Sequence, residues 1–151
     1  MTAQMMLADE AATAALGARI APLLRPGDVL ALEGGLGAGK TTLTRSILKA
    51  LGLKGEAPSP TFTIVHMYDE TEVILPVAHA DLYRLDDPED TVELGLDDYL
   101  VDGALIVEWP DRLEPRLRDA ALTLHLEVVQ DDARQLTARV PAAWRDRWPP
   151  R

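Results

Sequence analysis

The residues with the clearest chemical potential lie in the stretch GGLGAGKTT, from Gly34 to Thr42. It matches the pattern G-x-x-x-x-G-K-[ST] at Gly34, Gly39, Lys40 and Thr41. A loop with few side chains can wrap its backbone N–H groups around a polyphosphate, and a lysine can reach the β- and γ-phosphates. A threonine hydroxyl is a hard oxygen ligand of the kind that Mg²⁺ takes. The pattern therefore predicts a phosphate-binding P-loop.

The segments on either side of this stretch predict a strand-to-helix turn. The apolar run from Val29 to Leu32 is typical of a buried strand, and residues 42–53 carry apolar side chains at the spacing of one helix face. A helix that begins at Thr41 adds its N-terminal partial positive charge to the site. We therefore expect the nucleotide to lie against the whole stretch: Gly34, Gly35, Leu36, Gly37, Ala38, Gly39, Lys40, Thr41 and Thr42.

Two acidic residues are candidates for the second half of such a site. Asp81 follows the apolar run VILPVAHA, and Glu108 follows ALIV. Hydrolysis at a P-loop also requires an acid near the metal and a group that orients water. Both carboxylates stand where a strand would end facing the P-loop. The alternative for each is a capping or solvated acid at a strand exit.

Two residues near these segments each have a functional and a structural interpretation. Thr61 lies in SPTFT, a proline-containing loop that could sense the γ-phosphate as a GTPase switch loop does, or could simply lead into a strand. Trp109 follows Glu108, where an aromatic ring could stack on a base or a partner, or could pack in the core or at its rim.

Arginines and histidines elsewhere in the chain carry weaker signals. The run DRLEPRLRD could form a kinase-type lid over phosphates, although a solvated helix face is the commoner explanation for Arg112, Arg116 and Arg118. Three histidines stand on strand-like runs without metal-ligand spacing. We interpret them as structural: His66, His79 and His125.

Length and composition indicate one globular domain. The chain has 151 residues, of which 47% are hydrophobic, and no apolar run approaches the roughly 18 residues of a membrane span. It has no cysteine, which fits a cytoplasmic protein, and its first residues lack the basic start of a signal peptide. The net charge is −10, with 17 acidic and 9 basic side chains in residues 76–151. A chain with this charge lacks the basic surface that binds a phosphate backbone, so we expect any nucleic acid to be held by a partner.

The order of the expected elements predicts an α/β fold. We expect a single P-loop NTPase-like domain over residues 1–140, with a mixed β-sheet flanked by helices and a loose C-terminal tail over 141–151. The expected helices cover residues 9–24 and 42–53, with one or two short helices in 86–103. The expected strands cover 28–33, 61–69, 72–85, 104–110, 120–129 and 134–141. Pro76 argues that the strand over 72–85 is an edge strand or is interrupted. The nucleotide should lie at the carboxyl ends of the strands.

Five motifs together resemble one family. GGLGAGKTT, SPTFT, HADLYRL, ELGLDDYL and IVEWPDRL occur in an order and at a spacing similar to those of the bacterial TsaE family of small P-loop ATPases. The resemblance covers roughly residues 9–140, and HADLYRL and IVEWP are its specific parts. One departure is visible, because family loops often carry an acidic residue where this chain has Gly35. The backbone cradle should survive this change, although any contact made by that acid is lost.

The resemblance implies a role for several residues. Lys40 and Thr41 would hold phosphate and Mg²⁺, and Glu108 would be the second carboxylate on the magnesium side. Asp81 would act near the γ-phosphate. It also implies that Thr61 belongs to a switch-like loop and that Trp109 lies beside the site. The segment DDAR (131–134) makes Arg134 a weaker candidate for contact with the nucleotide.

The family's activity is the further implication. A TsaE-like protein would bind ATP and Mg²⁺ and hydrolyse ATP in the pathway that makes N6-threonylcarbamoyladenosine on tRNA. Its partners would be TsaD and TsaB, which transfer the threonylcarbamoyl group, and its ATPase activity would reset their complex between turnovers. Two alternatives remain open at this point. One is a small-molecule or nucleoside kinase; the other is a GTPase-like switch, although no N-K-x-D guanine reader is present.

The acidic segment between Asp81 and Asp102 also has two interpretations. It contains one basic residue, Arg84, among its nine acids. A solvated face is the usual explanation for such a run. The alternative is that part of residues 86–98 docks on the TsaD–TsaB complex, since unlike charges there could steer association.

Overall fold

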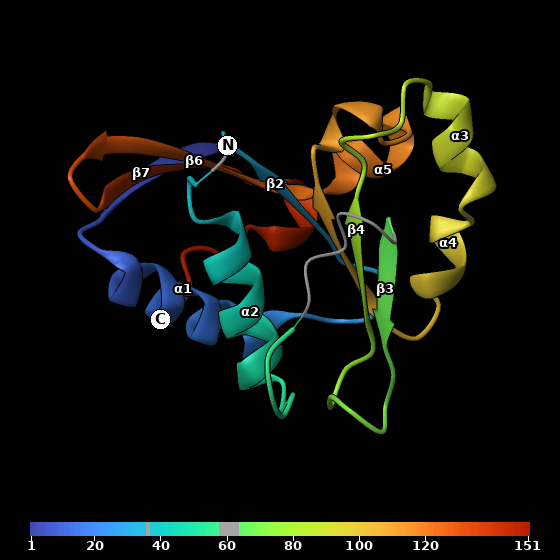
Figure 1. Cartoon of the computed structure of the whole chain (residues 1–151), viewed down its shortest axis with the longest axis horizontal. Coiled ribbons are helices and arrows are strands. Elements are labelled where there is room, and N and C mark those ends of the chain that lie inside the picture. The colour runs from blue at the N-terminus through green and yellow to red at the C-terminus, as the bar shows by residue number, and fades with distance from the viewer. Residues whose placement is uncertain (36, 58–63) are drawn as a thin grey trace.

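A single mixed β-sheet organises the chain (Figure 1). The computed structural model describes residues 1–35, 37–57 and 64–151. Within these residues the sheet has seven strands in the order β1-β7-β6-β2-β5-β4-β3. Their bounds are β1 (Thr2–Leu7), β2 (Val29–Glu33), β3 (Val65–Tyr68), β4 (Val77–Asp81), β5 (Ala104–Glu108), β6 (Leu122–Gln130) and β7 (Ala133–Arg139).

The helices cover the two faces of the sheet separately (Figure 1). One face packs against α1 (Glu10–Ile20) and α2 (Lys40–Ala50). The other packs against α4 (Leu96–Tyr99) and α5 (Pro115–Ala120), and α3 (Pro88–Glu93) lies beside α4. Three short 3₁₀ helices complete the elements of the described residues: Ala21–Leu23, Pro110–Arg112 and Ala142–Trp144. The expected fold class, an α/β domain with a mixed sheet flanked by helices, is confirmed.

The pairing explains why the sheet is mixed. β2 lies between β5 and β6 and runs parallel to both, and β4 runs parallel to β5. The pairs β3–β4, β6–β7 and β1–β7 are antiparallel, and two of them are the predicted hairpins. The carboxyl ends of β2, β4 and β5 therefore lie at one edge of the sheet, where an α/β fold binds its ligand.

The pleat of the central strands assigns each side chain to one of two cores. In β2, Leu30 and Leu32 pack with α1 and α2, whereas Val29 and Ala31 face the other core. The same alternation sends Ile106 of β5 toward α2. Strands covered on both faces read as continuous apolar runs, which is why 28–33 and 104–110 could be recognised from the sequence.

The two helices on the P-loop face cross at very short range. A Cβ atom on Gly17 of α1 would overlap the hydroxyl of Ser46 in α2 and would lie 2.9 Å from the carbonyl oxygen of Leu43. At its start, α1 is capped by Asp9, whose carboxylate accepts a hydrogen bond of 2.8 Å from the backbone N–H of Ala12. No helix in the described part of the chain is long and apolar enough to cross a membrane.

Several expected boundaries need correction. The helix expected over 9–24 ends at Ile20, because Pro22 lacks a backbone N–H and the chain tightens into a 3₁₀ turn. The second helix begins at Lys40 rather than at Thr41 or Thr42. Of the two outcomes expected for Pro76, the interruption is correct: β4 begins at the next residue and lies inside the sheet. The strand β1 was not expected at all.

The expected loose tail is wrong. Trp144 and Trp148 are buried in the core formed with α1 and α2. Arg147 is 8% exposed and forms a bidentate pair with Asp28, with Nη1–Oδ2 at 2.6 Å and Nη2–Oδ1 at 3.0 Å. Asp28 stands at the entrance to β2, so residues 141–148 are tied to the central strand.

Candidate nucleotide-binding site

The glycine-rich stretch is shaped by positive backbone torsions. Gly34 has φ of 139°, and a Cβ there would come within 2.5 Å of the carbonyl oxygen of Leu126. Gly39 has φ of 110° and is the N-cap residue of α2, directly before Lys40. Both positions therefore require glycine, in agreement with the two fixed glycines of the motif. The sequence prediction of a strand–loop–helix arrangement is confirmed for the described residues.

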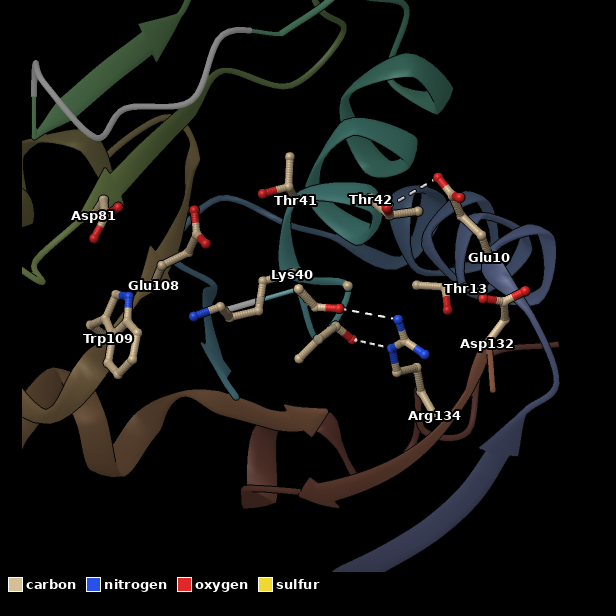
Figure 2. Close-up of a pocket in the computed structure, with 13 residues that line it drawn as sticks. Glu10, Thr13, Lys40, Thr41, Thr42, Asp81, Glu108, Trp109, Asp132 and Arg134 are labelled. Carbon is tan, nitrogen blue, oxygen red and sulfur yellow. Dashed lines mark hydrogen bonds between the residues drawn. The ribbon is translucent and has the colours of Figure 1, made fainter. Parts of the chain in front are cut away.

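A pocket of about 380 Å³ opens beside this loop. It brings together most of the residues expected at the site, and its lining is Glu10, Thr13, Gly37, Ala38, Gly39, Lys40, Thr41, Thr42, Asp81, Glu108, Trp109, Asp132 and Arg134. Figure 2 shows Asp81, Glu108 and Trp109 on one side of the loop, and Glu10, Thr13, Asp132 and Arg134 on the other. Gly34 and Gly35 are not part of the lining, and Leu36 and Thr61 lie outside the described residues.

Lys40 is held between the loop and an aromatic ring. Its side chain is largely buried, and Nζ donates a hydrogen bond of 2.8 Å to the carbonyl oxygen of Gly34. Nζ also lies 4.1 Å from the ring centroid of Trp109, a cation–π contact. Burial lowers the pKa of Lys40, while Glu108 and Asp81 oppose this shift through their negative charge. The ammonium thus lies within the influence of both candidate carboxylates.

Trp109 takes up an unusual backbone conformation to reach this position. Its φ is 57°, in the left-handed region that side chains other than glycine seldom adopt. The indole ring also packs against Tyr83, with 4.9 Å between ring centroids. A strained residue held by contacts with both Lys40 and Tyr83 fits the prediction that Trp109 lies beside the site.

The two acidic candidates stand side by side at the ends of neighbouring strands. Asp81 of β4 and Glu108 of β5 are direct partners in the parallel register. Asp81 accepts a hydrogen bond of 3.0 Å from the backbone N–H of Tyr83, so it also caps the turn after its strand. Glu108 is 6% exposed. Both carboxylates line the pocket together with Lys40 and Thr41 of the P-loop.

The sequence interpretation missed His79. Its Nε2 lies 2.8 Å from Oε2 of Glu108, and the imidazole is 3% exposed. The signal that could have found it is its spacing, since His79 precedes Asp81 by two residues and so shares its face of β4. Glu10, Thr13 and Asp132 were also missed. Glu10 and Thr13 come from α1, with no motif around them, whereas Asp132 lies in the β6–β7 turn within the segment DDAR, for which only Arg134 was named.

Arg134 braces the loop from the opposite side. Its Nε donates to the carbonyl oxygen of Ala38 at 3.0 Å, and its Nη2 donates to that of Gly37 at 3.1 Å (Figure 2). These bonds fix carbonyl groups of the loop. The guanidinium remains at the wall of the pocket, where it was expected to meet a nucleotide.

The three arginines for which a lid was the alternative interpretation lie away from the pocket. Arg112 donates to the carbonyl oxygen of Leu85 at 2.6 Å, and Arg116 pairs with Asp97 at 2.7 Å. Among the residues that the structure describes, none of Arg112, Arg116 and Arg118 lines the pocket. A phosphate-clamping lid built from this run is therefore not supported.

The oxygen donors at the pocket suit a magnesium ion. Thr41 offers a hydroxyl, and Asp81 and Glu108 offer carboxylates, all of which are hard ligands. The described residues contain no cluster of three or more histidine, cysteine or acidic side chains that would cage a metal alone. Mg²⁺ in nucleotide sites is bound through one or two protein ligands, phosphate oxygens and water, so this sparse donor set fits.

Comparisons with known proteins agree with this geometry. The family model described as "Threonylcarbamoyl adenosine biosynthesis protein TsaE" matches residues 7–136. Two proteins named "tRNA threonylcarbamoyladenosine biosynthesis protein TsaE" are similar: that of Bacillus subtilis is 40% identical over 83% of this chain and 77% of its own length, and that of Streptomyces coelicolor is 39% identical over 88% and 91%. A solved structure, "Crystal structure of Bacillus subtilus YdiB", matches with a TM-score of 0.73 and 34% identity over 91% of this chain and 84% of that one. The chain therefore belongs to the TsaE family.

Proposed function

We propose that this protein is a Mg²⁺-dependent ATPase that serves the complex making N6-threonylcarbamoyladenosine on tRNA and resets TsaD–TsaB between turnovers. The observation that carries the ATPase part is convergence in a single pocket: Lys40 and Thr41 at the start of α2, with Asp81 and Glu108 at adjacent strand ends. The TsaE relatives carry this pathway in their names, which supports the assignment of the complex.

Each group of residues in the pocket would have a separate role in hydrolysis. Backbone N–H groups of the loop and the start of α2 would cradle the phosphates, and Lys40 would leave Gly34 to meet them. Thr41 and Glu108 would hold Mg²⁺, which supplies charge neutralisation at the β- and γ-oxygens. Asp81 would orient the attacking water, and Thr61 is proposed to sense the γ-phosphate. Trp109 and Arg134 would form the two walls beside the nucleotide.

A kinase is the second candidate, and the structure offers it less support. A kinase needs a pocket for its acceptor next to the P-loop and a clamp on the phosphates. Two smaller pockets found in the described residues lie away from the loop, between α5 and β7 and between β1 and Trp148. The arginines that could have formed a clamp are bound to main-chain carbonyls or to Asp97.

One assay separates the candidates. The protein is incubated with ATP or GTP and Mg²⁺, with and without TsaD–TsaB, and inorganic phosphate release is measured. The proposal expects phosphate from ATP, faster in the presence of both partners. A phosphorylated small molecule formed in place of inorganic phosphate would identify a kinase. A preference for GTP over ATP would favour the GTPase-like switch.

The docking surface for TsaD–TsaB is proposed on the acidic segment. Asp87, Glu89 and Asp90 are exposed at the start of α3, and Val92 beside them is 56% exposed, which gives the surface an apolar part. Unlike charges on the partner would speed association at low salt. The protein would work in the cytoplasm and meet tRNA only through this complex.

Reversing the charge of these three acids to lysine tests the surface. The variant should bind nucleotide as the wild type does, because none of the three acids lines the pocket. Its association with TsaD–TsaB should slow, and the wild-type on-rate should fall as salt rises. A wild-type on-rate for this variant at low salt would move the docking surface elsewhere.

A further inference from the structure

The buried contact between His79 and Glu108 is the feature that the proposed function leaves unexplained. The side chains are 4% and 8% exposed, and Nε2 lies 2.8 Å from Oε2. Among the described residues Nδ1 has no hydrogen-bond partner, so Glu108 is the one polar contact of this imidazole. A ring needed only to fill space would be apolar, because a buried nitrogen without a partner is unfavourable.

The strand register explains how the two side chains meet. His79 is the direct partner of Ile106, and Asp81 is the direct partner of Glu108. Because side chains two residues apart share a face, His79, Asp81 and Glu108 all point toward the face that carries α2. Glu108 lines the pocket and His79 does not, so the imidazole contacts Glu108 behind the wall of the pocket.

Glu108 is subject to two competing attractions in this position. One is the positive charge of Lys40, since the negative charge of Glu108 raises the pKa of Lys40 against the effect of burial. Yet Nζ of Lys40 donates to the carbonyl oxygen of Gly34, and no ion pair between Lys40 and Glu108 is formed within the described residues. A hydrogen bond from Nε2–H to Oε2 would keep the carboxylate turned away from the ammonium.

We propose that His79 is a positioning residue, which holds Oε2 of Glu108 so that Oε1 remains available to Mg²⁺ and Lys40 remains free for phosphate. This role rests on the proposed nucleotide function. Partners behind a metal ligand generally change metal affinity by about 10–100-fold when they are removed. We expect a loss of that size when the donor at position 79 is removed and Glu108 is left without it.

The test compares a variant that keeps the ring with one that keeps the donor. His79→Phe retains an aromatic ring but donates no hydrogen bond. His79→Gln has an amide nitrogen at about the same reach as Nε2. His66→Phe is the matched control, because His66 is the strand partner of His79 on β3 and lies against Tyr68. The measurement is the Mg²⁺ concentration that half-saturates binding of the fluorescent analogue mant-ATP.

We expect His79→Phe to raise this Mg²⁺ concentration about 10–100-fold, with His79→Gln and His66→Phe close to wild type. In a Glu108→Gln background, His79→Phe should add no further rise. Thermal melts of the nucleotide-free proteins provide a second readout, in which the effects of the His79 and Glu108 changes should be non-additive. This readout requires neither metal nor nucleotide.

Two results would overturn the positioning role. One is a wild-type Mg²⁺ requirement in His79→Phe. The other is an equal rise in the required Mg²⁺ concentration in His79→Phe and His79→Gln, together with additive effects of the His79 and Glu108 changes on thermal stability. That second result would make the imidazole a packing residue only. An absence of Mg²⁺-dependent binding in the wild-type protein would instead overturn the proposed function, and the positioning role with it. The wild-type curve alone distinguishes this case.

Discussion

Breaking the pair between Asp28 and Arg147 should destabilise the whole domain. Arg147 donates to both carboxylate oxygens of Asp28, to the carbonyl oxygens of Leu23 and Ala143, and lies 3.9 Å from the ring centroid of Trp144. The side chains of the pair are only 7% and 11% exposed. Asp28→Ala would therefore leave a guanidinium buried without its counter-charge.

The size of the loss follows from the burial. Removing one partner of a buried ion pair costs about 3–5 kcal/mol, because the remaining charge is not solvated. For a chain of this size each kcal/mol lowers the melting temperature by about 2–4 °C, so we expect a fall of roughly 6–20 °C. Arg147→Met added to Asp28→Ala should recover part of this loss, since the double variant buries no charge.

Thermal unfolding followed by circular dichroism measures these effects. Arg139→Met is the matched control, because Arg139 and Glu33 are 3.9 Å apart with side chains 65% and 31% exposed. An exposed pair of this kind contributes at most about 1 kcal/mol. A melting temperature for Asp28→Ala as high as that of Arg139→Met would refute the reasoning, and so would a double variant less stable than Asp28→Ala.

The remaining predictions concern the pocket. Lys40→Ala should abolish phosphate release from ATP while the protein stays folded by circular dichroism; wild-type turnover would remove the P-loop from the mechanism. Glu108→Gln should weaken binding of Mg–ATP more than binding of ATP in EDTA, and equal losses would contradict a metal role. Asp81→Asn should lower hydrolysis by about 10²-fold or more with little change in affinity; a variant that loses only affinity would make Asp81 structural. Gly35→Asp should fold as stably as Gly35→Ala, because a Cβ at this position meets no atom within 4 Å; a large loss of stability in melts would show the loop to be tighter than described.

The parts of the fold that could be predicted depend on local patterns. The P-loop motif fixes four residue types within eight positions, and β2 and β5 are apolar runs because both faces of these strands are covered. By contrast, β1 pairs with β7 across more than a hundred residues, and only this distant partner makes the mixed sequence TAQMML a strand. Tertiary contact outweighs local propensity there.

The tail and the inner part of the site could not be predicted for a related reason. Residues 141–151 contain arginine, proline and tryptophan without period, so nothing in the sequence indicates that Arg147 meets Asp28 more than a hundred residues away. His79 stands in an apolar strand, where an isolated histidine usually packs. Its contact with Glu108 depends on which strands are neighbours, and the order of strands in the sheet cannot be predicted from the sequence of any one strand.

The absence of a side chain at Gly17 has a consequence for how the pocket can open. Because α1 and α2 touch there at backbone range, the helix that carries Lys40 cannot separate from the helix that carries Glu10 and Thr13 without a void opening between them. The helices α1 and α2 should therefore move as one rigid body through a catalytic cycle. Any change in the width of the pocket would then come from the side where Asp81 and Trp109 lie. Distance probes placed on α1 and α2 should give a constant separation with and without ATP, whereas probes on α2 and α3 should report the motion.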